Sequence, residues 1–439
     1  MPNFRFIDLF AGIGGFHQAM TQLGGECVMA CEIDAAARKI YELNYLTNNQ
    51  VDFRFSKDIT EFNEETASEV PDHDVLCAGF PCQPFSKSGK QLGINEARGT
   101  LFYNILAIIE AKKPAMIVLE NVRNLAGPRH IETLDTIRRL LKGLGYYLPE
   151  SPLILSPHKL PSPYGAPQHR ERVYILAVRY SSDWDTGDNV RDIADVLRPM
   201  HSPSWSVSDF CDPKESSPKL PQTVERAIET WGTFANVLKD KSVKVPSFPL
   251  WSESWGQQQT SDDLPGWKRK ILDKNQQFYL EHKRIIDEWL GCENYLSMTP
   301  TQRKLEWQCG DHWDIWNALI QIRPSGIRVK RMTHFPAMVA INQRSILGNP
   351  YRRYISVNEG LKLQGFDASF TFAGQSDDAS FKQLGNAVNV GAVKFVVLLS
   401  QMLWGERFPS DALQLDLYEN PMINMAWVKQ RVDQPKLFQ

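Results

Sequence analysis

Short apolar runs alternate with amphipathic stretches through the first 180 residues, and this alternation predicts a repeating βα unit. The runs have the length of buried strands; they cover Phe4–Phe10, Cys27–Cys31, Asp52–Phe55, Asp74–Ala78, Ala115–Leu119 and Val173–Val178. The stretches between them have helical spacing over 16–23, 34–44, 101–112 and 131–144. Strands that alternate with helices form a sheet covered on both faces. We therefore predict an α/β fold with a doubly wound, mostly parallel sheet.

The pattern changes near residue 180. Residues 181–350 are rich in Pro, Ser and Trp, and nine of the twelve tryptophans lie between Trp205 and Trp316. These aromatic side chains could bind bases or glycans, although the core of a small domain is their commoner use. One long helix is predicted from Gly266 to Leu290. Further on, a helix ending at Gln364 and an apolar helix, Val390–Leu403, are predicted.

This change suggests a second, smaller, irregular domain, and the chain is long enough for two. We predict a catalytic and cofactor-binding domain at 1–180, completed by 372–405, because the apolar helix needs the first sheet as its core. Residues 181–371 form the second domain and a hinge, and residues 406–439 form a C-terminal tail.

Acidic side chains follow the ends of several predicted strands, where ligands of open α/β sheets bind. The turn Ala11–Gly15 has glycines that let a ligand approach the backbone, but its spacing matches neither GxGxxG nor a P-loop. Glu32 is placed to bind ribose hydroxyls, or to interact with the start of the next helix. Asp58 could accept a hydrogen bond from the exocyclic amine of a base, or cap a helix. Together these signals indicate a nucleoside pocket.

Cys82 lies between two prolines in the loop Gly79–Ser86, directly after a predicted strand. Proline restricts the backbone and removes a donor, so the loop holds the thiol out of the core. A buried or idle thiol is the alternative interpretation. We interpret Cys82 as a covalent nucleophile that shares a crevice with Glu120, whose pKa would be raised in a dry cleft so that it can donate a proton. Arg170 and Arg172 lie two apart on an extended segment and suit an anionic partner.

The net charge of −2 argues by itself against a nucleic-acid partner, but its distribution does not. The segment Arg323–Arg353 carries seven Lys or Arg and no acid, which could steer a polyanion or be a solvated basic face. The seven cysteines show no paired or metal-ligand spacing, so we predict reduced thiols and no metal site. No signal peptide or membrane-spanning run is recognised, and a cytoplasmic location is expected.

These residues occur in ordered motifs, and with them the chain resembles the DNA (cytosine-5)-methyltransferases of bacterial restriction–modification systems. The motifs are Asp8–Gly15, Gly79–Ser86, Glu120–Val122, Gln168–Arg172, Arg353–Phe366 and Gln383–Val388. Residues 181–322 remain unmatched and correspond to the family's target-recognition domain. The resemblance implies a Rossmann-like methyltransferase fold, S-adenosyl-L-methionine as methyl donor, and a cytosine flipped out of double-stranded DNA.

By this resemblance, Cys82 attacks C6 of the cytosine, Glu120 engages N3 and the exocyclic amine, Arg172 supports this assembly and Arg170 lies beside it. The implied cofactor-binding residues are Phe10, Ile13, Gly14, Glu32, Ile33, Asp58, Ile59, Pro81, Leu101, Asn386 and Val388. The implied DNA-binding residues are Gln83, Ser86, Gln168 and Arg353. Gln83 and Ser86 face the flipped base's gap or its phosphates, whereas Gln168 and Arg353 touch the DNA backbone or brace the target loop.

An RNA methyltransferase that acts on tRNA shares these motifs and is the alternative. The long segment 181–322 favours sequence-specific DNA, since a tRNA enzyme reads shape with less added protein. A non-catalytic relative would be expected to lack Cys82, Glu120 or the arginines, and all are present. We expect a monomer that works alongside a partner restriction endonuclease.

Overall fold

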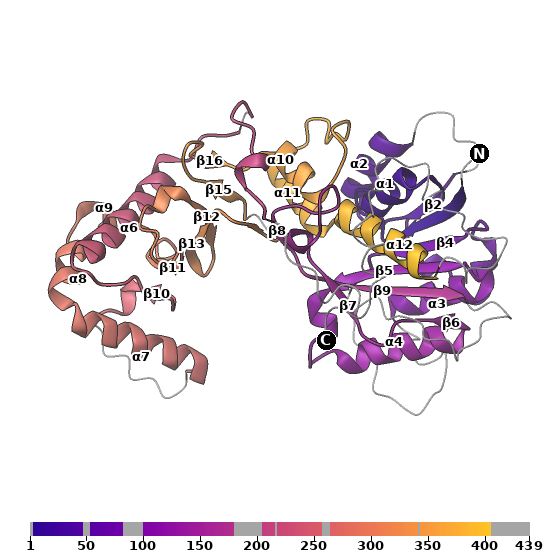
Figure 1. The fold of residues 1–439 in the computed structure, drawn as a ribbon, viewed down its shortest axis with the longest axis horizontal. Coiled ribbons are helices and arrows are strands. Elements are labelled where there is room, and N and C mark those ends of the chain that lie inside the picture. Colours follow the sequence, from indigo (N-terminus) through magenta and orange to yellow (C-terminus); the bar gives the residue numbers. More distant parts are fainter. Residues whose placement is uncertain are drawn as a thin grey trace, which may run out of the picture. The chain divides into compact units, whose positions relative to one another are not determined.

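The computed structural model describes residues 3–46, 53–81, 100–179, 204–215, 217–256, 264–340 and 343–404. By their internal contacts the residues group into two compact units (Figure 1). Unit 1 comprises residues 1–204 and 361–439, and unit 2 comprises residues 205–360. The helix α10 (Val357–Gln364) contains the second boundary between them.

Unit 1 is built on one sheet with the strand order β3-β2-β1-β4-β5-β9-β6, and β7 also pairs with β9. The strands are β1 (Phe4–Leu9), β2 (Gly25–Cys31), β3 (Arg54–Ser56), β4 (Val75–Ala78), β5 (Met116–Val122), β6 (Tyr146–Tyr147), β7 (Leu153–Leu155) and β9 (Arg172–Arg179). The strands β1 to β5 pair in parallel, whereas β9 runs antiparallel to β5. The predicted α/β fold with a mostly parallel sheet is confirmed.

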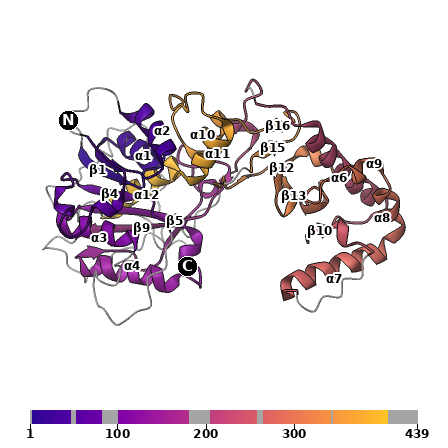
Figure 2. The same cartoon turned by 180° about the vertical axis from the view of Figure 1, so that it is seen from behind.

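Helices cover both faces of this sheet. They are α1 (Gly15–Gln22), α2 (Ala35–Tyr45), α3 (Leu101–Lys112), α4 (Ile131–Gly143), α11 (Asp377–Asn386) and α12 (Val390–Trp404). The helices α3 and α4 share one core with Ile7 and Leu9 of β1, while α1 lies on the face toward which Asp8 points (Figures 1 and 2). This alternation follows from the two-residue period of a strand.

The helices α11 and α12 contribute to the core of unit 1. The stretch Asp377–Gln401 is long and apolar enough to cross a membrane, but 83% of its most apolar window is buried inside the protein. Two helices make up this stretch, and residues 387–389 interrupt them. The core helix α12 therefore explains the apolar signal.

Unit 2 has a smaller mixed sheet with the order β10-β11-β13-β12-β15-β16. Its strands are β10 (Leu250–Trp251), β11 (Lys304–Gln308), β12 (Ala318–Arg323), β13 (Gly326–Arg331), β15 (Ser345–Leu347) and β16 (Arg353–Tyr354). Its helices are α6 (Gln222–Asp240), α7 (Gly266–Glu281), α8 (Lys283–Leu290) and α9 (Glu293–Leu296). Many of the tryptophans form its core; Trp231, Trp255, Trp289, Trp307 and Trp316 are buried.

The prediction of one helix from Gly266 to Leu290 is wrong. The helix α7 ends at Glu281, and α8 begins at Lys283 after His282 leaves the helical conformation with φ −124° and ψ 23°. The bend lets Ile286 and Trp289 enter the same core as α6, and Tyr279 donates a hydrogen bond to Asp287 (2.9 Å) across it.

Candidate active site

The turn between β1 and α1 depends on glycine at two positions. Gly14 has φ +86°, and a Cβ atom there would lie 2.1 Å from Cε2 of Tyr45, whose hydroxyl donates to the Gly14 carbonyl (3.0 Å). A Cβ on Gly15 would lie 2.7 Å from Cγ2 of Val388. The turn therefore packs tightly on one side against α2 and on the other against the segment before α12.

On its open side, this turn meets the end of β2. The Glu32 carboxylate accepts hydrogen bonds from the backbone N–H groups of Gly12 and Asp34, both at 2.7 Å. No atom lies within 4 Å of the Cβ position of Gly12, and the neighbouring Ile33 side chain is 70% exposed. An acid, an exposed apolar side chain and open space above a turn fit the ribose and adenine ring of S-adenosyl-L-methionine.

The other predicted cofactor-binding residues differ in the solvent exposure of their side chains. Phe10 lies in the turn with φ +58°, Asn386 is exposed, Leu101 is half-buried at the start of α3, and Pro81 is exposed. Val388 is buried between Gly15 and Gly79.

Ile13 and Ile59 point into the core, so only their backbone groups could reach a ligand. The Asp58 carboxylate accepts from the Thr60 N–H at 2.9 Å, which is the capping alternative left open by the sequence.

A buried ion pair lies near the end of β5. Glu120 is 8% exposed, and its Oε1 lies 3.0 Å from Nε of Arg172, at the start of β9. Burial raises the pKa of Glu120, while the charges of Arg172 and Arg170 act in the opposite direction. A carboxyl group with a raised pKa can hold a proton and donate it to a base.

Arg170 performs a different task from Arg172. Its side chain donates to the carbonyl groups of Gly385 (3.0 Å) and Ala387 (2.7 Å), which flank Asn386. Burial and the neighbouring Arg172 lower its pKa to about 9. These contacts make Arg170 a positioning residue for the segment 385–387; a contact with the reacting atoms stays a prediction.

The nucleophile predicted from the sequence, Cys82, lies outside the described residues, as do Gln83 and Ser86. The chain that leads to it is described as far as Pro81. Phe80 is buried against Phe102, and its carbonyl accepts a hydrogen bond from the side chain of Asn121 (2.9 Å). Asn121 thus fixes the base of the loop, a role that sequence reasoning missed although the residue lies in a quoted motif.

Two predicted DNA-binding residues are buried. Arg353 is 8% exposed, pairs with both carboxylate oxygens of Glu359 at 2.8 Å and donates to the Asp212 carbonyl (2.8 Å). Among the alternatives given for Arg353, these contacts favour bracing. Gln168 is fully buried, and its side-chain amide has no hydrogen-bond partner among the described residues.

The basic segment Arg323–Arg353 is partly neutralised by acids from other parts of unit 2. Arg323 and Arg328 both pair with Glu306. Arg352 lies 3.8 Å from Glu229, and Arg353 pairs with Glu359. The free positive charge is therefore smaller than the sequence suggests, because folding brings these acids to the segment.

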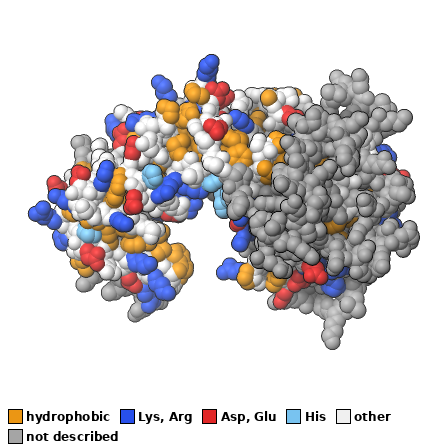
Figure 3. All heavy atoms as spheres, in the orientation of Figure 1, with side chains coloured by type: hydrophobic (Ala, Val, Ile, Leu, Met, Phe, Trp, Pro, Cys, Tyr) orange, Lys and Arg blue, Asp and Glu red, His pale blue; other side chains and the backbone are white. Residues whose placement is uncertain are grey.

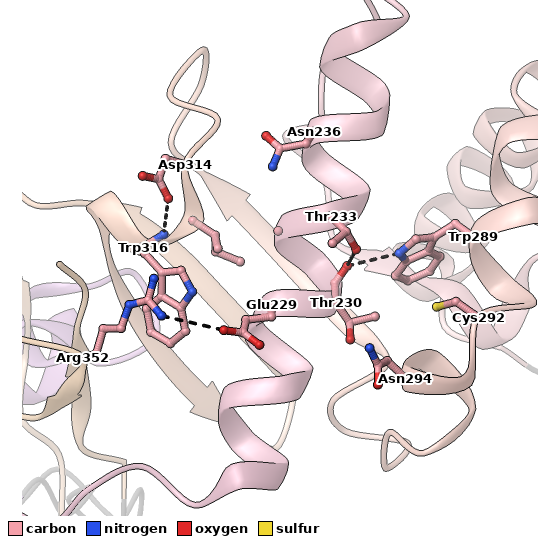
Figure 4. Close-up of a pocket in the computed structure, with 12 residues that line it drawn as sticks. Glu229, Thr230, Thr233, Asn236, Trp289, Cys292, Asn294, Asp314, Trp316 and Arg352 are labelled. Atoms are coloured by element: carbon pink, nitrogen blue, oxygen red, sulfur yellow. Dashed lines mark hydrogen bonds and ion pairs between the residues drawn. The ribbon is translucent and has the colours of Figure 1, made fainter.

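A polar pocket of about 560 Å³ in unit 2 is separate from all predicted site residues. Figure 4 shows Arg352 lying over the Trp316 ring, 4.5 Å from its centroid, with Glu229 beside it. On the opposite wall, Trp289 donates to the Thr230 carbonyl at 3.1 Å. None of the predicted catalytic residues is among the described residues that line this pocket, so we do not assign it to methyl transfer.

A buried acid beneath the glycine turn was also missed. Asp8 of β1 is fully buried, and its carboxylate accepts from the backbone N–H of His17 (3.1 Å) in the first turn of α1. Gly14 precedes this helix and has no side chain to cap it, so Asp8 supplies the cap from the neighbouring strand. Burial raises the pKa of Asp8 well above its ordinary value. An acid within an apolar strand pattern was the available signal.

Residues 4–399 match the family of C-5 cytosine-specific DNA methylases. The chain belongs to this family. It is 34% identical over 478 residues to the type II methyltransferase M.AluI of Cellulosimicrobium cellulans, covering 90% of this chain and 91% of that protein. It is 44% identical over 394 residues to the type II methyltransferase M.HpaII of Haemophilus parainfluenzae, covering 89% and 87%.

A solved structure, described as a prophage-encoded DNA modification methyltransferase from E. coli, has a similar fold. Its TM-score is 0.51 at 18% identity, covering 91% of this chain and 99% of that one. The protein is thus a DNA (cytosine-5-)-methyltransferase, and its family uses S-adenosyl-L-methionine. The two type II methyltransferase relatives, each matched over most of its length, favour DNA over the RNA alternative, and the predicted family, activity and cofactor are confirmed.

Proposed function

We propose that this methyltransferase modifies a flipped-out cytosine within a specific DNA sequence through a covalent bond between Cys82 and C6 of the base. The observation that supports this proposal is the buried pair of Glu120 and Arg172. The pair lies near the carboxyl end of β5, beside the strand β4 from which the chain leads to Cys82. A thiolate and a proton donor would then face one base.

Each group has a defined part in the reaction. Addition of the Cys82 thiolate to C6 pushes electron density into the ring, and a proton from Glu120 to N3 accepts the developing charge. Arg172 orients the Glu120 carboxyl. When bound, S-adenosyl-L-methionine supplies the electrophilic methyl group that C5 accepts. Loss of the C5 proton to a base and of the Cys82 thiolate from C6, together with return of the N3 proton to Glu120, restores the neutral aromatic ring and the starting enzyme.

The cofactor would be held by the turn around Phe10 and Gly14, with Glu32 on the ribose hydroxyls and Ile33 against the adenine ring. Backbone groups of Ile13 and Ile59 would complete this site, together with Asp58, Pro81, Leu101, Asn386 and Val388. Arg170 would act indirectly, since it holds the two carbonyl groups that flank Asn386.

The biological setting is part of the proposal. The relatives M.AluI and M.HpaII are type II methyltransferases, which supports pairing with a restriction endonuclease whose cleavage the methyl group blocks. We assign residues 181–371 to target recognition and the hinge, with Gln83, Ser86, Gln168 and Arg353 contacting DNA or bracing the loop. A cytoplasmic monomer suits an enzyme that flips one base at a time.

A trapping experiment tests the covalent step. Bisulfite sequencing of DNA from cells that express the protein first identifies the target cytosine. A duplex with 5-fluorocytosine at that position should then form an adduct that survives denaturation, because C5 cannot lose fluorine as it loses a proton. Cys82→Ser should give no adduct and no methylation while binding the cofactor normally. Substantial turnover by this variant would refute the covalent mechanism.

A further inference from the structure

The helix α7 presents an exposed row of one aromatic and two basic side chains. Trp267, Lys270 and Lys274 occupy positions i, i+3 and i+7, which lie on the same side of a helix. Trp267 is 63% exposed, an unusual state for so large an apolar side chain, and both lysines are exposed. Figure 3 shows Lys and Arg side chains on the surface of unit 2 around α7. We call these three residues the α7 row.

The other side of α7 fixes the helix in unit 2. Phe278 and Tyr279 lie in the core, and the fully buried Asn275 makes four hydrogen bonds. Its side chain accepts from Trp251 N–H (2.8 Å) and Trp255 Nε1 (3.1 Å), and it donates to the carbonyls of Pro249 and Ile271, both at 2.9 Å. The row is therefore held on a rigid support.

The basic charge of this part of α7 is not neutralised by the intramolecular contacts of the row. Residues Lys268–Lys274 include four cations and one acid, Asp273. Among the described residues, neither Lys270 nor Lys274 forms an ion pair with an acid; Lys274 lies over the Phe248 ring, 5.7 Å from its centroid. Lys268 and Arg269 lie in the first turn of α7, where cations oppose the helix macrodipole and no acid is present. Lys270 and Lys274 lie further along the helix at positions i and i+4, where two like charges repel each other.

We propose that the α7 row binds the phosphodiester backbone of double-stranded DNA, independently of its sequence. DNA carries about one negative charge per 1.7 Å of its axis, so two fixed lysines can each displace a counterion. Trp267 adds an aromatic surface for the sugar–phosphate chain. An anionic membrane is a poorer match, because the apolar side of α7 is already packed in its own core and cannot insert.

The test compares two double variants of the full-length enzyme. Binding to a 40-base-pair duplex of arbitrary sequence is measured over a range of salt concentrations. Lys270→Gln/Lys274→Gln should bind more weakly at low salt, and the slope of log K against log salt should fall by about 1.8, or 0.9 per phosphate contact. Lys239→Gln/Lys241→Gln, which removes two exposed charges at the end of α6, is the matched control and should leave the slope within about 0.3.

Trp267→Ala provides an independent measurement, since it changes no charge. It should weaken binding about threefold to tenfold by removing apolar contact area, without altering the salt slope, because only counterion release sets that slope. An unchanged slope in the Lys270/Lys274 variant would overturn the proposal. Equal weakening of DNA binding by the two double lysine variants would overturn it as well, since the effect would then depend on the total charge and not on the α7 row. Binding of the unmodified enzyme to anionic vesicles that the row variant alone abolishes would assign the surface to a membrane instead.

Discussion

At the scale of single residues, the turn between β1 and α1 requires glycine at position 14 because of its backbone conformation and its contact with Tyr45. Gly14→Ala would place a methyl group 2.1 Å from the Tyr45 ring at φ +86°. We expect a loss of more than about 2 kcal/mol in the free energy of unfolding and much weaker cofactor binding. Chemical denaturation and calorimetric titration with S-adenosyl-L-methionine measure these effects.

Gly145 offers a matched control for this substitution. It has φ +87°, but its Cβ position has no atom within 4 Å, and it lies in the turn before β6. Gly145→Ala should lose only the cost of the left-handed conformation, about 1 kcal/mol, and should bind the cofactor normally. Equal effects of the two substitutions would show that contact with Tyr45 is unimportant.

Asp8 gives a pH dependence whose sign follows from its burial. Because burial raises its pKa in the folded state, the folded protein holds this proton more tightly than the unfolded chain. Its contribution to stability is therefore greatest at acidic pH and falls as pH rises above the ordinary value, by at most about 1.4 kcal/mol per pH unit. Asp8→Asn should keep the bond to His17 and remove this decline.

Denaturation of both proteins between pH 4 and pH 7 measures the effect. The stability of the asparagine variant relative to the unmodified protein should increase as pH rises. Parallel curves would mean that Asp8 titrates normally in the folded state. Glu120 is expected to act in the same direction, so its own substitution by Gln separates the two contributions.

At the scale of secondary-structure elements, α7 depends on one buried amide. Asn275→Ala leaves two N–H groups and the Pro249 carbonyl without their partner, whereas the Ile271 carbonyl keeps its backbone bond within the helix. Buried polar groups without hydrogen bonds are costly, and we expect unit 2 to lose ~3 kcal/mol of stability. Gln277→Ala, on the exposed side of the same helix, should change stability by less than about 0.5 kcal/mol. Thermal unfolding of both variants distinguishes these outcomes, and similar melting temperatures would contradict the role of Asn275.

The elements themselves were predictable to different degrees. The strands β1, β2, β4 and β5 were found because continuous apolar runs are typical of strands buried on both faces. The break at His282 was not found, because the residues on both sides have good helical spacing. The break allows Tyr279 to bond with Asp287 and Trp289 to enter a core shared with α6. The packing of Trp289 against α6 joins distant parts of the chain and leaves no local signal in the sequence.

At the scale of the whole molecule, the proposed function places the chemistry in unit 1 and target recognition in the segment that contains unit 2. Replacing residues 205–360 with the corresponding segment of an M.HpaII-type relative should change the DNA sequence that is methylated, while the product remains 5-methylcytosine. Bisulfite sequencing reads the target, and cofactor titration verifies that unit 1 is folded. An unchanged target in a folded, active chimaera would show that specificity resides in unit 1.

The sequence by itself determined the α/β class, the family and the order of the motifs, because the strand patterns and the residues at strand ends are local properties of the chain. The rule that ligands bind at strand ends placed Glu120 in one crevice with Cys82, and the family resemblance associated Arg172 with Glu120. Only the tertiary structure decided that Arg170 holds the carbonyls around Asn386, that Asp8 caps α1, and that Glu306 and Glu359 neutralise part of the basic segment. Arg170 and the carbonyls that it holds lie more than 200 residues apart, and the other pairs, although nearer in the sequence, join different elements, so each meets only when the fold brings those elements together.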